Sequence, residues 1–152
     1  MTDVAGEEES DHQRLTRNVN ELLGELRVAQ AGVQILFGFL LAVVFTPTFR
    51  AAPLVDKSLH LVAVLLAVLA TALLSAPAAW HRVLFRAGRR QEILRLGNRL
   101  VVLGLVCLAL AVSVTVALIG KAVFGVVAMV ILAAVVAAVF AYLWFIAPWR
   151  LR

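Results

Sequence analysis

Long apolar stretches alternate with short polar segments along the chain. Four stretches contain no Asp, Glu, Lys or Arg: Val28–Phe49, Ser58–His81, Leu100–Gly120 and Ala122–Trp149. Each has at least 21 residues, and at about 1.5 Å per residue a helix of this length crosses a hydrocarbon core of about 30 Å. The pattern therefore predicts four transmembrane helices, over about residues 28–49, 58–80, 99–120 and 122–147.

The polar segments between these spans are too short to form a separate catalytic domain. Residues 1–13 are acidic and lack hydrophobic periodicity, so we expect a disordered tail there and a four-helix transmembrane domain over residues 14–152. From Leu15 onward, apolar residues recur at helical spacing. The predicted fold is all-α: an integral membrane four-helix bundle with an N-terminal amphipathic helix continuous with the first span.

The breaks between spans carry turn residues. The two prolines of FTPTFRAAPLVDK predict a loop over residues 46–57, and GKAVFG predicts a tight turn between the last two spans. The N-terminal segment lacks the basic region and apolar core of a secretory signal, so we expect the first span to remain in the mature protein.

The composition predicts where the protein is located, and the distribution of charge predicts its orientation in the membrane. The chain is 63% hydrophobic, with a mean hydropathy of +0.99, which is typical of a membrane protein. Of its 14 Lys and Arg residues, all but Arg50, Lys57 and Lys121 lie in the N-terminal segment, the central loop or the C-terminal tail. Because cytoplasmic loops retain cations, this predicts a multi-pass plasma (inner) membrane protein with both termini cytoplasmic. We expect the bilayer and its anionic lipid headgroups as partners, and no nucleic acid.

The first span has one polar row of residues. At about 100° per residue, Asn20, Arg27 and Gln34 fall on one side of the helix, Ala31 and Gly38 lie beside them, and Gln30 lies just to one side. Amides are costly against lipid, and small residues let a second backbone approach, so we expect this polar stripe to contact protein. The partner is either the third or fourth span of the chain or a second copy. A polar lining for a permeation route is the alternative.

Two acids precede the first span on the same side of the membrane as a basic loop. Glu21 and Glu25 are expected to form salt bridges with that loop, although a solvated helix face is an open alternative. The arginines of the loop are also candidates for lipid headgroup contacts. The four singled out are Arg82, Arg86, Arg89 and Arg90.

The sequence carries no constellation typical of catalysis or metal binding. His12, His60 and His81 fall in different parts of the predicted topology, and the only cysteine, Cys107, lies within a span. Hydroxyl residues in spans usually bond their own backbone. We therefore expect no enzyme activity, no metal site and no cofactor. No predicted span contains an Asp or Glu, whereas ion-coupled carriers usually have one within the membrane.

Three runs carry a family resemblance over roughly residues 15–147: NELLGELRVAQAGVQILFGFLLAVVF, ATALLSAPAAWHRVLFRAGRRQE and LWFIAP. The chain resembles an actinobacterial family of small four-span membrane proteins of unknown function, some members of which are labelled sodium:proton antiporter. The resemblance implies a four-span membrane protein, and its label implies cation or proton transport.

The function that these observations favour is a non-enzymatic scaffold or accessory subunit that self-associates. Four short helices bury little in common, and the first and fourth spans each carry small residues suited to a second contact. We expect a homodimer or a higher homo-oligomer with the first span at or next to the contact. An unidentified membrane protein is a further candidate partner. The alternative function is a small cation or proton transporter resembling a sodium:proton antiporter.

Overall fold

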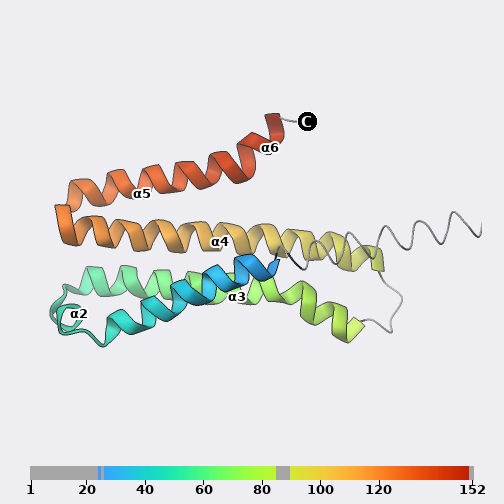
Figure 1. Cartoon of the computed structure of the whole chain (residues 1–152), viewed down its shortest axis with the longest axis horizontal. Coiled ribbons are helices and arrows are strands. Elements are labelled where there is room, and N and C mark those ends of the chain that lie inside the picture. Colours follow the sequence, from blue (N-terminus) through green and yellow to red (C-terminus); the bar gives the residue numbers. More distant parts are fainter. Residues whose placement is uncertain (1–23, 25, 85–89, 151–152) are drawn as a thin grey trace, which may run out of the picture.

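The computed structural model describes residue 24 and residues 26–84 and 90–150 (Figure 1). The expected tail and nearly all of the amphipathic segment before the first span lie outside the described residues. So do five of the polar residues singled out above, namely Asn20, Glu21, Glu25, Arg86 and Arg89.

Every described element is helical. The first span, Leu26–Val44, is followed by α2 (Pro47–Ala51), α3 (Leu54–Leu84), α4 (Arg90–Phe124) and α5 (Val126–Ala141). The last helix continues through a π-helical turn, η1 (Tyr142–Ile146), into α6 (Ala147–Arg150). Four helices are long and apolar enough to cross a membrane: Leu26–Val44, Leu54–Trp80, Leu96–Phe124 and Val126–Arg150. The prediction of an all-α helical membrane bundle is confirmed.

The segment that we expected to be a loop, residues 46–57, is largely helical. Thr46 caps α2 by accepting a hydrogen bond from the Phe49 backbone N–H at 3.2 Å, and Pro47 occupies the start of the helix. Pro53 directly precedes α3. Proline suits a first helical turn because the N–H it lacks has no intrahelical partner there. The prolines thus begin two helices here, and α3 carries Asp56 in its first turn.

The connection between α4 and α5 is a single residue. The α4 helix runs on through Lys121 to Phe124, and Gly125 alone reverses the chain with φ 90° and ψ −174°. This conformation is open to glycine and strained for residues with a Cβ. The turn is therefore tighter than the GKAVFG segment predicts, and α5 lies directly against α4.

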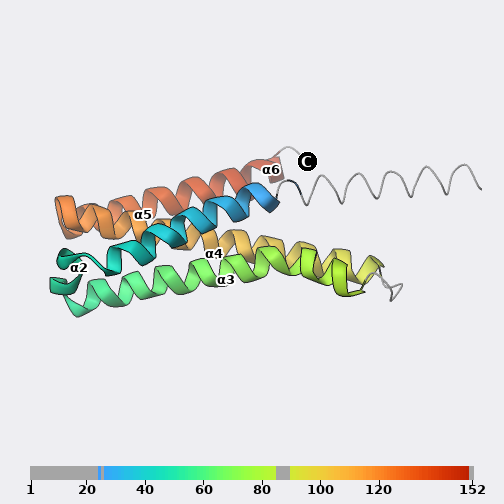
Figure 2. The same ribbon diagram turned by 60° about the horizontal axis from the view of Figure 1, so that its bottom comes forward.

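The buried core takes its residues from three of the four spans. The first span contributes a seven-residue repeat of Leu26, Val33 and Leu40, which packs against small residues of α3 and the middle of α4. By contrast, α5 has no buried residue and lies on the side of α4 away from α3 (Figures 1 and 2). The bundle is thus a three-helix core with a fourth helix outside it. The α3 and α4 residues of the core are Ala63, Ala67, Ala70, Leu74, Val101 and Ala111.

Candidate interaction face

The two glutamines of the first span lie in different environments. Gln30 is half-buried, and its Nε2 donates a hydrogen bond to the backbone oxygen of Leu74 in α3 at 3.1 Å. Gln34 is exposed. Gln30 thus contacts protein within the chain, and its partner is the second span rather than the third or fourth.

The rest of the described polar stripe is turned away from the core. Arg27, Ala31, Gln34 and Gly38 are all exposed, and we call these four residues the outer face. At about 100° per residue, they centre about 130° around the helix from the buried row that begins at Leu26. A Cβ added to Gly38 would meet no atom within 4 Å. Nothing in the described chain covers the outer face.

The outer face reaches well into the apolar length of the helix. The span begins at Leu26, and Gln34 lies eight residues further on, which corresponds to a rise of about 12 Å. Since the hydrocarbon core is about 30 Å thick, the Gln34 amide lies near its middle when the helix crosses the bilayer. Its two donors and its acceptor are therefore placed where water is absent.

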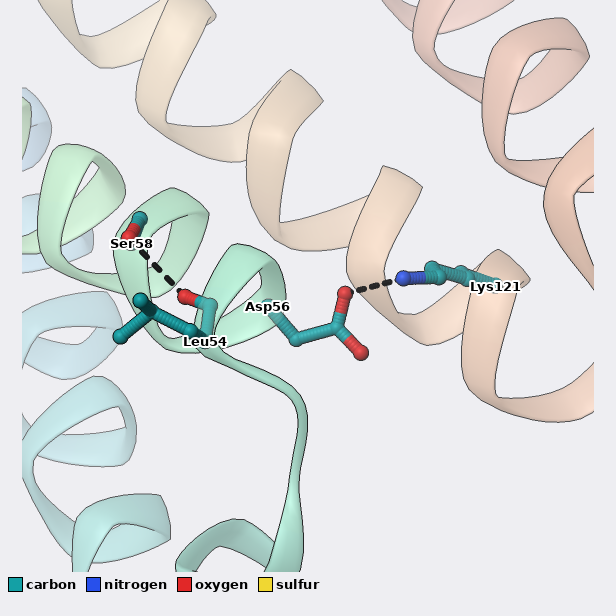
Figure 3. A network of polar contacts seen from close by, with 4 residues as sticks. All are labelled: Leu54, Asp56, Ser58 and Lys121. Atoms are coloured by element: carbon teal, nitrogen blue, oxygen red, sulfur yellow. Dashed lines mark hydrogen bonds and ion pairs between the residues drawn. The ribbon is translucent and has the colours of Figure 1, made fainter.

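At the opposite end of the bundle, an ion pair joins α3 to α4. The Lys121 ammonium, in the last turn of α4, donates to the Asp56 carboxylate in the first turn of α3 (Figure 3). Each charge also lies at the helix end whose dipole favours it. From the sequence, both residues were expected in loops, and no pairing between them was predicted. The available signal was that these were the acid and the base nearest the ends of two antiparallel spans.

The same end carries two contacts to backbone oxygens. The Lys57 ammonium donates to the Arg50 oxygen at 2.8 Å, which ties α3 to α2. His60 is buried, with 6% exposure, and its Nε2 lies 2.9 Å from the Leu40 oxygen of the first span. The Phe49 ring packs edge-on against the imidazole, with 4.7 Å between ring centroids. His60 therefore serves packing between three elements.

The hydroxyl groups of the spans bond their own helices, as expected from sequence. Thr71, Ser75, Ser113 and Thr115 each donate to the backbone oxygen four residues earlier, at 2.7 to 2.9 Å. Within the described ranges, no three His, Cys, Asp or Glu side chains gather where they could hold a metal ion. The contacts of Gln30, Asp56, Lys57 and His60 thus join helices to one another, whereas those of the hydroxyl groups stay within a helix.

The arginine-rich end of the bundle is only partly described. Arg82 lies in the last turns of α3, and Arg90 begins α4. The bridges expected between these arginines and Glu21 or Glu25 lie outside the described residues. Three arginines at this end are described in full and exposed: Arg27, Arg99 and Arg150.

A sequence model of the family described as "Family of unknown function (DUF6328)" matches residues 8–148 of the chain. No curated protein matches the chain, and no solved structure does.

Proposed function

The chain belongs to this family of unknown function. From the geometry of the chain, we propose that it is a non-enzymatic membrane scaffold or accessory subunit that self-associates through the outer face. One observation carries the proposal: the exposed amide of Gln34 lies at hydrocarbon depth on a face that the described chain leaves uncovered. An amide without hydrogen bonds in an apolar medium costs about 2 to 7 kcal/mol. A protein partner removes that cost.

A second copy of the chain suits this face better than an unrelated partner. A primary amide is both donor and acceptor, so two Gln34 side chains related by a two-fold axis satisfy each other. Ala31 and Gly38 lie about one turn to either side and are exposed, which lets two helices approach closely. Copies inserted in one membrane share an orientation, and a two-fold axis along the membrane normal brings identical faces together.

The proposal includes the orientation and location expected from the charges. Both termini lie in the cytoplasm, and the arginine-rich end of the bundle faces the cytoplasmic leaflet of the plasma membrane. The supporting observation is the strong bias of Lys and Arg toward that end.

The test compares two glutamines that differ in environment. The oligomeric state of wild type, Gln34→Leu and Gln30→Leu is measured by native mass spectrometry from mild detergents. We expect a wild-type dimer, with Gln34→Leu weakening the association about 3- to 30-fold, since an interhelical bond in membranes is worth about 0.6 to 2 kcal/mol. Gln30→Leu is the matched control, because its amide is engaged with Leu74 inside the chain. A wild type that is monomeric in every detergent, whether anionic phospholipid is left out or added, would remove the proposal.

The opposing function is a small cation or proton transporter. It is separated from a scaffold by liposomes loaded with a sodium or pH gradient. A scaffold leaves the gradient intact. Gradient-driven flux that Gln34→Leu abolishes would instead assign the outer face to a permeation route.

A further inference from the structure

The outer face ends in a permanent positive charge. Arg27 lies four residues before Ala31 and seven before Gln34, so it shares their side of the helix, and it is exposed. Whatever covers Gln34 and Gly38 therefore also meets a cation at the edge of the membrane.

Arg27 lies level with two other arginines. Gln30 donates a hydrogen bond to the Leu74 oxygen, and a Cβ on Gly104 would lie 2.9 Å from the Leu74 side chain. These three residues therefore lie at the same level along the long axis of the bundle. Arg27 and Arg99 lie three and five residues from that layer, on the same side of it.

The fourth span adds the third arginine. A Cβ on Gly120 would lie 3.3 Å from the Ala128 oxygen. The α4 and α5 helices run antiparallel (Figure 1). Arg99 lies 21 residues before Gly120 and Arg150 lies 22 residues after Ala128, so the two arginines come level. The apolar length of the first span starts at Leu26, and that of the fourth ends at Arg150. Arg27 and Arg150 therefore lie at the ends of these two spans, where a helix that crosses a bilayer meets the lipid headgroups.

Self-association brings two of these charges together. In a two-fold dimer whose Gln34 side chains meet, the two first spans run in the same direction, so the two Arg27 side chains approach each other across the axis. Like charges at the edge of an apolar medium oppose the association. A phosphate between them reverses this effect, because guanidinium binds phosphate oxygens through paired hydrogen bonds.

We propose that the phosphate of an anionic phospholipid binds between the Arg27 side chains of two copies, and that association through the outer face depends on this lipid. The inference rests on the proposed self-association. The lipid is the natural source because its phosphate is fixed at the level of Arg27. A zwitterionic headgroup carries no net charge to offset the two cations. The outer face is then a surface whose pairing responds to the composition of one leaflet.

The test measures association in two bilayers. The full chain, tagged at its C-terminus with donor or acceptor fluorophores, is reconstituted into vesicles of phosphatidylcholine with or without phosphatidylglycerol. Energy transfer should report association about fivefold tighter with phosphatidylglycerol, since an arginine near an anionic surface gains about 1 kcal/mol, which is about a fivefold change in an equilibrium constant. Arg27→Gln should associate equally in both vesicles. Arg99→Gln is the matched control, with a charge lost at the same level but off the outer face, and it should keep the lipid dependence.

The outcomes separate this inference from the proposed function. Wild type that associates equally well in both vesicles overturns the lipid requirement and leaves self-association in place. Wild type that associates in neither removes both. Arg27→Gln that keeps the lipid dependence, or Arg99→Gln that loses it, overturns the role of Arg27. Inorganic phosphate that restores association in phosphatidylcholine vesicles assigns the anion to solution and overturns a lipid source.

Discussion

At the scale of single residues, the polar groups of the spans are placed according to what each can bond. Gln30 and Gln34 are one helical turn apart, yet Gln30 reaches the Leu74 oxygen while Gln34 is exposed. The carbonyl of Leu73, next to Leu74, has no helical hydrogen-bond partner, because Pro77, four residues further on, has no N–H to donate. The amide of Gln30 thus adds a donor to the stretch of α3 that is short of one.

The ion pair at the other end of the bundle gives the prediction at this scale. Asp56 and Lys121 have side-chain exposures of 24% or less, so their attraction is screened less than that of a pair on an open surface. We expect Asp56→Asn and Lys121→Met each to lower stability, with a coupling of about 1 kcal/mol, the upper end for exposed pairs. Unfolding in mixed micelles with increasing SDS measures the two single variants and the double variant.

A coupling near zero would contradict the structural role of this pair. The matched control is Lys57→Met. Its ammonium donates to the Arg50 backbone oxygen rather than to a carboxylate, so its coupling to Asp56→Asn should be smaller than that of Lys121→Met.

At the scale of elements, small residues decide how closely the helices approach. The α3 surface in the core is a row of three alanines followed by Leu74. The α4 helix approaches Leu73 and Leu74 with a glycine, Gly104. In a membrane, helices associate through such close packing and not through hydrophobic burial, because lipid is as apolar as the side chains. The spacing of α3 from α4 is therefore sensitive to a single methyl group.

Two glycines of α4 test this statement. A Cβ at Gly104 would lie 2.9 Å from Leu74 Cγ and 3.2 Å from Leu73 Cβ, whereas at Gly97 the nearest atom, Pro77 Cβ, is 3.7 Å away. We expect Gly104→Ala to destabilise the bundle by about 1 to 3 kcal/mol through overpacking. Gly97→Ala should be neutral or stabilising, because alanine favours a helix over glycine by up to about 1 kcal/mol. SDS unfolding ranks the two variants, and equal effects would contradict the packing described.

The sequence predicts the spans but not their mutual arrangement. Long uncharged runs identify all four helices, since burial of a helix in lipid requires little else. In α5, however, all 16 residues are apolar, so no periodicity indicates which side meets α4 or that the helix lies outside the core. Likewise the polar stripe of the first span predicts contact with protein, but the three-dimensional packing divides it between Gln30 inside and Gln34 outside. Prolines 47 and 53 were ambiguous because proline both ends and begins helices.

At the scale of the whole molecule, four antiparallel spans return the chain to the side where it starts. The beginning of the first span and α6 lie at one end of the bundle, and α2 and Gly125 lie at the other (Figure 1). The first end carries Arg27, Arg99 and Arg150. The other carries Arg50, Lys57 and Lys121, two of which are engaged by oxygen atoms of the chain. Free positive charge is thus concentrated at the first end among the described residues.

This asymmetry predicts the orientation in the membrane. In a Cys107→Ala background, which removes the only native cysteine, single cysteines are introduced as Ala52→Cys, after α2, and Ala87→Cys, in the central basic segment. Because positively charged segments are retained in the cytoplasm, a membrane-impermeant maleimide should label Ala52→Cys in intact cells and Ala87→Cys only after permeabilisation. The reverse labelling pattern would show that the protein has the opposite orientation in the membrane. It would also move Arg27 to the outer leaflet, so that any anionic lipid between two copies would have to come from that leaflet instead.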